Sequence, residues 1–237
     1  MAETLSIDAV RARRHAALLT VGVGVGVAHA VLFLVSYWLL TSAPGPHSSD
    51  EELVAFYERG DKRDLILVGL YVMPFAGIAF LWFSVALRAW IRACSPRESE
   101  LYSGMQLVSG ILYVALFFAA AAASSVMAVS AEFSRAHVDP VVARLFPQYG
   151  ATLLLVFAMR MASMFVFTTS RIGRVTGTLP RWFTRVGFVV GLFLLLSATF
   201  SRMLVLVFPI WLLVLCVLLL ARAWRLAPVD GVQRTGS

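Results

Sequence analysis

The stretch that decides the fold is "MLVLVFPIWLLVLCVLLLA", residues 203–221, which contains no charged residue. An apolar run of about 18 residues or more is typical of a helix that crosses a bilayer, because about 20 helical residues span the hydrocarbon core. Similar runs recur along the 237-residue chain, which is 60% hydrophobic and 14% charged. A soluble domain usually carries about 25% charge. The sequence therefore predicts an all-α, polytopic transmembrane helical bundle.

The apolar runs define six predicted spans within a single membrane domain over residues 1–237. The spans cover residues 16–40, 65–87, 104–130, 151–170, 184–201 and 203–221. The last two are short and meet at Ser201 and Arg202. One long bent helix over 184–221, which would give five spans, is therefore the alternative. An even number of spans places both termini on the same side of the membrane.

The basic residues indicate which side faces the cytoplasm. With the N-terminus inside, 13 of the 20 basic residues fall in inner segments: Arg11, Arg13, Arg14, Arg88, Arg92, Arg97, Arg171, Arg174, Arg181, Arg185, Arg222, Arg225 and Arg234. The outer segments hold six: Arg59, Lys62, Arg63, Arg135, Arg144 and Arg202. Short cytoplasmic loops carry the excess of arginine and lysine in membrane proteins. The distribution therefore predicts cytoplasmic N- and C-termini.

Two outer segments are predicted to form short amphipathic helices that lie on the surface of the bundle. In "SSDEELVAFYERG", residues 48–60, Ser49 and the glutamate three residues later have the spacing of a capping box. In "HVDPVVARLFPQYG", residues 137–150, Asp139 is a predicted N-cap and Pro147 is expected to end the helix. These helices would cover the bundle or control access to a cavity within it.

The inner segment "SRIGRVTGTLPRW", residues 170–182, begins a cluster of arginines. The cluster consists of Arg171, Arg174, Arg181 and Arg185. Such a cluster beside a span attracts anionic lipid headgroups, at about 1 kcal/mol for each residue near the surface, although topology alone also accounts for it. The net charge is +7. No arginine-rich stretch outside the spans is interleaved with stacking aromatics, so nucleic acid is not an expected partner.

Small residues and prolines mark specific points on the spans. Gly22, Gly26 and Ala30 recur every four residues along the first span. Such a stripe lets another helix approach closely. We expect it to pack within the bundle, with homodimerisation as the alternative, so a homo- or hetero-oligomer is compatible with the sequence. Pro74 and Pro209 lie within spans, where proline removes a backbone hydrogen bond and kinks the helix.

One charge lies inside a predicted span, Arg160 in "ATLLLVFAMRMASMFVF", residues 151–167. A guanidinium at the bilayer centre costs from about 2.5 to more than 10 kcal/mol, so it requires acceptors, an anion or water. No span contains Asp or Glu. The polar groups expected near the depth of the arginine head are Ser36, Tyr71, Ser124, Ser125, Ser163 and Ser197. We expect a polar layer around Arg160, either a hydrogen-bonded hub or an outward-facing pocket for an anion or lipid headgroup.

Several kinds of site lack their usual sequence signatures. Of the four histidines only His29 lies well inside a span, so a bis-histidine haem has no second ligand. Five outer residues could converge: His47, Asp50, Glu132, His137 and Asp139. Their spacing matches no metal-binding motif, and we expect neither metal nor cofactor. The motifs HExxH and GxSxG are missing, which disfavours an intramembrane enzyme.

Four stretches carry a resemblance: "EELVAFYERGDKR" at 51–63, "FLWFSVALR" at 80–88, "SRIGRVTGTLPRW" at 170–182 and "FPIWLLV" at 208–214. In this order they resemble a family of uncharacterised bacterial multi-pass membrane proteins. The resemblance extends from about residue 30 to residue 222. It implies six spans in the bacterial inner membrane and brings no activity or binding residues.

We therefore expect an integral inner-membrane protein without catalysis, acting in packing, assembly or partner binding. The alternative is a small transporter or an anionic-lipid-binding protein, whose outward-facing pocket is anchored by Arg160. An intramembrane enzyme is the third choice.

Overall fold

The computed structural model describes residues 2–40, 43–45, 48–58, 62–94, 100–134, 137–197 and 202–226. Regular structure within these ranges is helical throughout. The helices are α1 (Ala2–Leu40), α2 (Asp50–Glu58), α3 (Arg63–Leu67), η1 (Val68–Val72), α4 (Met73–Cys94), α5 (Glu100–Phe133), α6 (Pro140–Thr152), η2 (Leu153–Ala158), α7 (Met159–Val175), α8 (Arg181–Leu196), η3 (Arg202–Leu206) and α9 (Val207–Leu226). The all-α fold class is confirmed.

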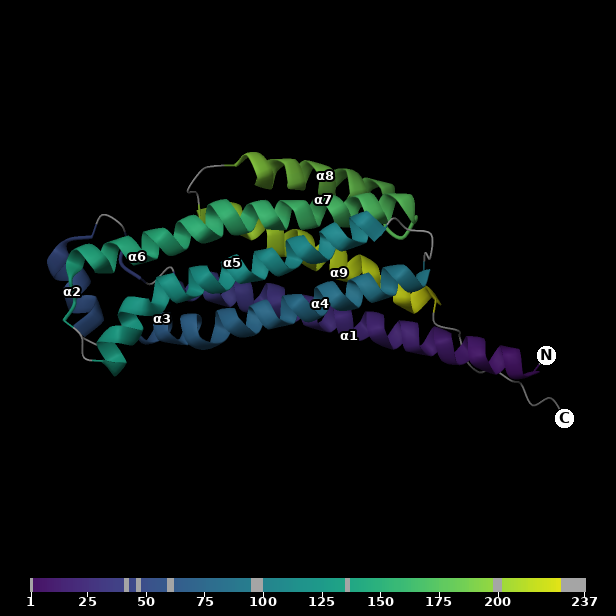
Figure 1. Ribbon diagram of the computed structural model, residues 1–237, viewed down its shortest axis with the longest axis horizontal. Coiled ribbons are helices and arrows are strands. Elements are labelled where there is room, and N and C mark those ends of the chain that lie inside the picture. Colours follow the sequence, from purple (N-terminus) through teal and green to yellow (C-terminus); the bar gives the residue numbers. More distant parts are fainter. Residues whose placement is uncertain are drawn as a thin grey trace.

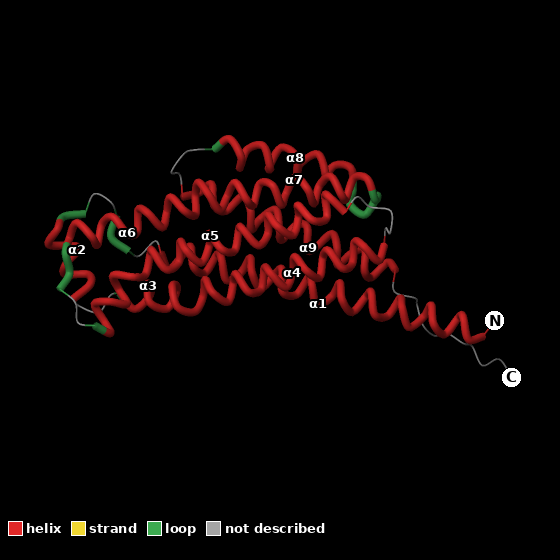
Figure 2. Tube along the Cα trace, in the orientation of Figure 1, coloured by secondary structure: helices red, strands yellow, loops and turns green. Residues whose placement is uncertain are grey.

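The long helices form one elongated bundle (Figures 1 and 2). Helix α1 packs against α4 and α9, and α5 packs against α4, α6 and α7. Helix α8 lies on the outside of the bundle, mainly against α7 (Figure 1). Because α1 begins and α9 ends at the same end, we call that end the inner end. The opposite end, which carries α2, is the outer end.

Five helical stretches in the described part of the chain are long and apolar enough to cross a membrane. They are Ala17–Leu40, Arg63–Ala93, Glu100–Phe133, Pro140–Val175 and Met203–Ala223. The remaining predicted span is α8, whose 16 residues cover only about 24 Å. It ends at Ser197, where the backbone is extended, and α9 is a separate helix. Residues 184–221 therefore form two helices and not one bent helix, while five helices in the described ranges, and not six, are long enough to cross a membrane. Residues 198–201 lie outside the described ranges.

The second outer helix differs from its prediction, because α6 is the first part of a span. Asp139 caps it as predicted, accepting a hydrogen bond from the backbone N of Val141 at 2.8 Å. Pro147 lies inside α6, and the helix continues through the π-helical η2 into α7. Gly150 explains why α6 does not lie flat on the surface. A Cβ there would be 2.9 Å from the carbonyl O of Ala120, so α6 is packed closely along α5.

The first outer helix, α2, forms as predicted and lies across the outer end of the bundle (Figure 1). The hydroxyl of Ser49 accepts a hydrogen bond from the backbone N of Glu52 at 3.2 Å. Leu53 and Tyr57 are buried, while the acidic residues of the first turn face away from the core and are exposed. The capping box and the amphipathic pattern therefore set both the start of α2 and the face it buries.

The small-residue stripe of α1 is the contact surface for α4 and α9. A Cβ at Gly22 would lie 2.9 Å from the Cβ of Ala86. One at Gly26 would lie 2.7 Å from the sulfur of Cys216, and Ala30 is fully buried. The stripe thus packs within the chain, which leaves it covered and not free for a second copy.

Each proline that is predicted to kink a span follows a segment that is not regular α-helix. Pro74 comes just after the π-helical η1, and Pro209 lies near the start of α9, just after the 3-10 helix η3. A proline leaves the carbonyl four residues earlier without its usual partner. Those carbonyls belong to Leu70 in η1 and Val205 in η3, so the irregular turns coincide with the freed acceptors.

His29 lies at the centre of the core among aromatic rings. Its Nδ1 is 2.8 Å from the carbonyl O of Ala76, and its Nε2 is 3.4 Å from the hydroxyl of Tyr113. Both ring nitrogens are therefore satisfied when Nδ1 donates and Nε2 accepts. The rings of Phe80 and Phe117 are among those packed around it. His29 is therefore part of a buried, well-packed aromatic core.

Candidate functional site

A cavity of about 470 Å³ lies at the outer end of the bundle. It is bordered by the outer half of α1, residues 43–45, α2, α5, α6 and η2. Pockets that hold one drug-sized ligand range from about 300 to 1,000 Å³. The cavity is therefore large enough for a single small ligand or one acyl chain.

The lining of the cavity is apolar at its floor and more polar toward the outside. Phe33 and Phe117 line the floor, both almost fully buried, with ring centroids 5.6 Å apart. Met73 and Val205 lie beside them. The polar lining residues are Ser36, Tyr37, Ser124, Arg144, Gln148 and Thr152. Among the described lining residues, Arg144 is the one that carries a charge.

The depth of these residues in a bilayer follows from helix length. The hydrocarbon core is about 30 Å thick, which is about 20 residues at a rise of 1.5 Å. Counting outward from Arg171 at the inner end of α7, the outer boundary falls near Ala151. Arg144 then lies seven residues beyond the boundary, about 10 Å along the helix. With the inner boundary set at Arg171, the floor of the cavity falls at the depth of acyl chains and Arg144 at the depth of headgroups.

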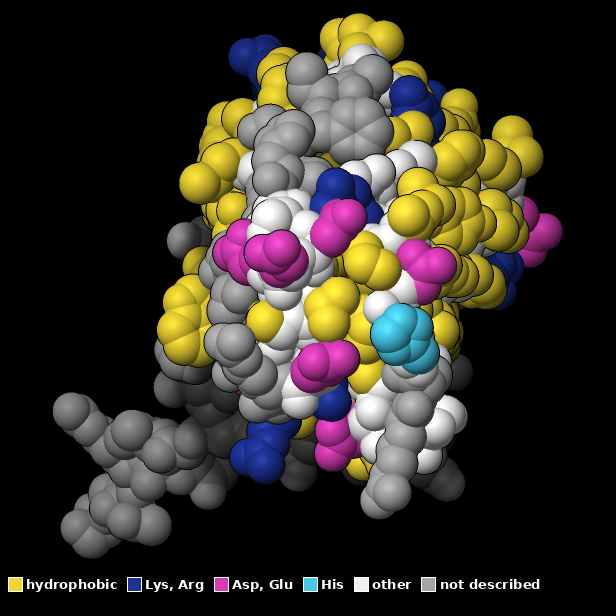
Figure 3. Space-filling model, turned by 90° about the vertical axis from the view of Figure 1, so that its left-hand side faces the viewer, with side chains coloured by type: hydrophobic (Ala, Val, Ile, Leu, Met, Phe, Trp, Pro, Cys, Tyr) yellow, Lys and Arg dark blue, Asp and Glu magenta, His cyan; other side chains and the backbone are white. Residues whose placement is uncertain are grey.

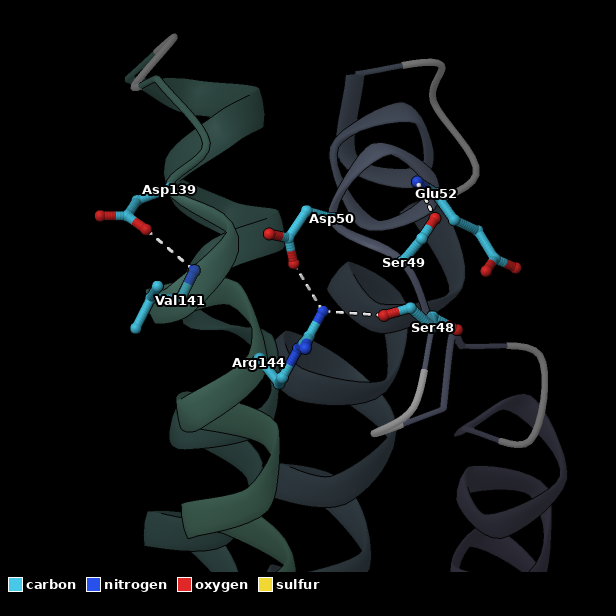
Figure 4. A network of polar contacts seen from close by, with 7 residues as sticks. All are labelled: Ser48, Ser49, Asp50, Glu52, Asp139, Val141 and Arg144. Atoms are coloured by element: carbon cyan, nitrogen blue, oxygen red, sulfur yellow. Dashed lines mark hydrogen bonds and ion pairs between the residues drawn. The ribbon is translucent and has the colours of Figure 1, made fainter.

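Arg144 connects α6 to the start of α2 (Figure 4). Its Nη2 donates to the carbonyl O of Ser48 and to Oδ1 of Asp50, both at 2.7 Å. Its Nε is buried and has no hydrogen-bond partner in the described structure. Because the guanidinium stays protonated, this Nε is a donor without an acceptor. A buried donor without an acceptor destabilises the folded protein by about 1–3 kcal/mol. An additional acceptor for the Nε of Arg144 would remove this cost.

Helix α2 forms the roof of the cavity. Leu53 and Tyr57 project from α2 into the lining, and burial raises the pKa of the Tyr57 hydroxyl, which stays neutral. The far end of α2 is held by Lys62, whose Nζ donates to the carbonyl O of Tyr57 at 2.7 Å. The same Nζ pairs with Glu132 at 3.2 Å. The roof is thus fixed at one end by a buried lysine and at the other by Arg144.

Acidic side chains gather on the face of the outer end (Figure 3). The acidic residues described there are Asp50, Glu51, Glu52, Glu58, Asp64, Glu132 and Asp139. The first turn of α2 alone contributes three of them. Arg144 is therefore a cation at the edge of an acidic surface.

Arg160, the residue expected to anchor the site, lies elsewhere. It is half-buried, and its Nη1 donates to the carbonyl O of Val156 at 2.9 Å. That is its one hydrogen bond within the described ranges. Nine residues inside Ala151, it is about 13 Å below the outer boundary. A cavity lies at the outer end of the bundle, but the arginine that lines it is Arg144 and not Arg160.

The expected polar layer around Arg160 does not form among the described residues. The hydroxyls of Ser36 and Ser125 donate to carbonyls of their own helices, and Ser163 donates to the carbonyl O of Gly191 at 2.7 Å. Tyr71 is exposed. Ser36 and Ser124 instead line the outer cavity, and Ser197 lies half-buried at the end of α8. The hydroxyls of Ser36 and Ser125 thus bond within their own helices, as short hydroxyl side chains often do, and that of Ser163 joins α7 to α8.

The outer acidic residues that could converge on a metal have separate partners. Asp50 pairs with Arg144, Glu132 pairs with Lys62, and Asp139 caps α6. Within the described ranges no group of three metal-ligating side chains comes together. His47 lies outside those ranges.

The four arginines of the predicted headgroup cluster are exposed at the inner end. They are Arg171, Arg174, Arg181 and Arg185. The guanidinium of Arg171 lies 5.2 Å from the ring centroid of Tyr102, a cation–π distance. Sequence reasoning missed Arg222, whose Nη1 donates to the carbonyls of Gly177 and Thr178 at 2.9 Å. Arg222 thereby fixes the turn between α7 and α8.

Comparisons of the chain with protein-family models, with curated protein sequences and with solved structures give no match. The chemistry of the outer cavity therefore has to be derived from its own residues.

Proposed function

We propose that this protein is a multi-pass integral membrane protein that binds one lipid-like amphiphile in its outer cavity. The observation that supports this function is the gradient along the cavity. An apolar floor of Phe33, Phe117 and Val205 lies at acyl-chain depth, and polar groups with Arg144 lie at headgroup depth. A ligand with an apolar tail and a polar head fits both, because each part meets groups of its own polarity.

An assembly role, the first expectation from the sequence, has less support. Its clearest surface was the stripe at Gly22 and Gly26, and α4 and α9 of the same chain cover that stripe. Transport and storage both require a bound state of the amphiphile. Binding is therefore the step that the cavity supports directly.

Filling the cavity from Ala151 should remove the ligand. Ala151 lines the cavity and is only half-buried, so the ring of an Ala151→Phe variant is expected to occupy part of the cavity volume. We expect the variant to lose most of the 1-palmitoylglycerol and 1-palmitoyl lysophosphatidylethanolamine that the wild type retains. Native mass spectrometry of the full chain, delipidated in a non-ionic detergent and then incubated with each amphiphile, measures the bound fraction.

The matched control is Ala122→Phe, which adds the same ring to an exposed position on α5. It should bind both amphiphiles like the wild type. An Ala151→Leu variant should show an intermediate loss. Retention of full binding by Ala151→Phe, with an unchanged melting temperature, would rule out the cavity as the binding site.

We also propose that the inner end faces the cytoplasm of a bacterial cell and binds anionic headgroups. Support comes from the 13-to-6 distribution of basic residues and from the exposed cluster containing Arg171 and Arg185. None of its four arginines forms an ion pair with a described acidic residue. Their charge is therefore available to anionic lipids of the cytoplasmic leaflet.

Cysteine labelling tests this orientation. In a background with Cys94→Ser and Cys216→Ser, a cysteine at Glu51 on α2 should react with a membrane-impermeant maleimide in intact cells. A cysteine at Arg181, exposed at the other end, should react only after the inner membrane is permeabilised. The reverse pattern would invert the orientation.

A further inference from the structure

The Nε donor of Arg144, which has no acceptor, indicates that the ligand's headgroup contains an anionic group. Nη2 is occupied by Ser48 and Asp50, whereas the buried Nε has no partner. Donors of a guanidinium bind anionic oxygens most strongly. Because Nε is buried, a phosphate or carboxylate oxygen of the ligand can accept its hydrogen bond only by drawing the guanidinium out of its present position.

Asp50, the ion-pair partner of Arg144, indicates the second charge of the ligand's headgroup. The carboxylate of Asp50 lies 2.7 Å from Nη2 and its side chain is 68% exposed. Asp50 also begins α2, next to Glu51 and Glu52. A ligand anion that drew Arg144 toward itself would leave this cluster of carboxylates less neutralised. The carboxylate of Asp50 would then lie without its counterion beside those of Glu51 and Glu52, and like charges repel.

We infer that the bound amphiphile is zwitterionic, with its anionic group on Arg144 and its cationic group on Asp50. This inference rests on the proposed function and adds the chemistry of the headgroup. A zwitterion placed between Arg144 and Asp50 gives each of them a new counterion. The Arg144–Asp50 ion pair can then separate without leaving either residue unpaired. A purely anionic headgroup satisfies Arg144 but lies beside the carboxylate of Asp50, which is 2.7 Å from Nη2, and like charges repel.

The inference is tested with three amphiphiles that share one palmitoyl chain. They are 1-palmitoyl lysophosphatidylethanolamine (zwitterionic), 1-palmitoyl lysophosphatidylglycerol (anionic) and 1-palmitoylglycerol (neutral). The bound fraction of each is titrated on the full chain by native mass spectrometry. We expect the wild type to bind the zwitterion about ten-fold more tightly than the anion, which is the effect of one charge-assisted interaction.

Changing Asp50 should reverse this preference. The Asp50→Asn variant keeps the size and position of the side chain but loses the site for the ligand's cation, so it should bind the anionic lysolipid more tightly than the zwitterion. Arg144→Gln should weaken both charged lysolipids about ten-fold more than it weakens 1-palmitoylglycerol. These two variants break the same ion pair, so a shared effect on folding cannot produce their different selectivities.

The matched control is Glu51→Gln, which removes one negative charge from the neighbouring position of α2 and should keep the wild-type order. The inference is overturned if the wild type prefers the anion, or if Asp50→Asn keeps the wild-type order. Either result is distinct from a failure of the proposed function, in which the neutral amphiphile also fails to bind or is unaffected by Ala151→Phe.

Discussion

Replacing Gly26 with leucine is expected to lower the melting temperature by about 5–10 °C. A Cβ at Gly26 would lie 2.6 Å from the ring of Phe83 and 2.7 Å from the sulfur of Cys216. Leucine adds three further carbons where α1 contacts α4 and α9, so the helices have to separate. Overpacking of a core typically costs about 1–3 kcal/mol. A thermal scan of tryptophan fluorescence in detergent measures the shift.

Gly24 provides the matched control for this substitution. It lies two residues away on the same helix, and an added Cβ there would meet no heavy atom within 4 Å. Gly24→Leu carries the same change in helix propensity and hydrophobicity but no overlap. It should therefore keep or slightly raise the melting temperature. Equal losses for the two variants would show that packing at Gly26 is not what stabilises the contact of α1 with α4 and α9.

The sequence predicts the helices of this fold well where an apolar run or a cap marks them. Hydropathy locates the long helices because apolar length is the physical requirement for crossing a bilayer. Asp139 and Ser49 are correctly identified as caps because their side chains act on backbone groups two or three residues away. Both signals are local, so both can be found in a single sequence.

At Pro147 the local sequence signal predicts a helix end that the structure does not have. Proline usually interrupts a helix, and the prediction therefore ended the outer helix there. In the structure, Gly150 allows α6 to pack tightly on α5, and that tertiary contact favours a continuous helix. Since the contact joins residues thirty positions apart in sequence, no local pattern reports it.

The arginine of the candidate site could not be identified from local sequence either. Arg160 stands out in the sequence because it is a lone charge in a predicted span, whereas Arg144 lies in a segment predicted to be a surface helix and counts only toward topology. What makes Arg144 notable is its place on the cavity wall beside Asp50, which depends on how α2 folds over α6. Predicting an outward pocket with an arginine was possible, but identifying the arginine required the arrangement of four helices.

Replacing Arg160 with leucine is expected to raise the stability of the protein in lipid nanodiscs by about 2 kcal/mol, or roughly 4–8 °C in melting temperature. The side chain lies about 13 Å inside the outer boundary, and its one hydrogen bond within the described ranges goes to the carbonyl O of Val156. No carboxylate is present in any predicted span to neutralise it. The desolvation cost of the charge is therefore only partly offset, and leucine removes it.

An Arg160→Lys variant serves as the control, because it keeps the charge at the same depth and should not be stabilised. Arg144→Leu should lower the stability, in contrast to Arg160→Leu, since it breaks the bonds to Ser48 and Asp50 that join α6 to α2.

A loss of stability in Arg160→Leu would mean that Arg160 holds helices together after all. A gain would mean that the charge is kept at a cost to folding. An intramembrane charge that destabilises the fold is retained for a role outside it, and native mass spectrometry of the two Arg160 variants would then show which lipid or partner is lost.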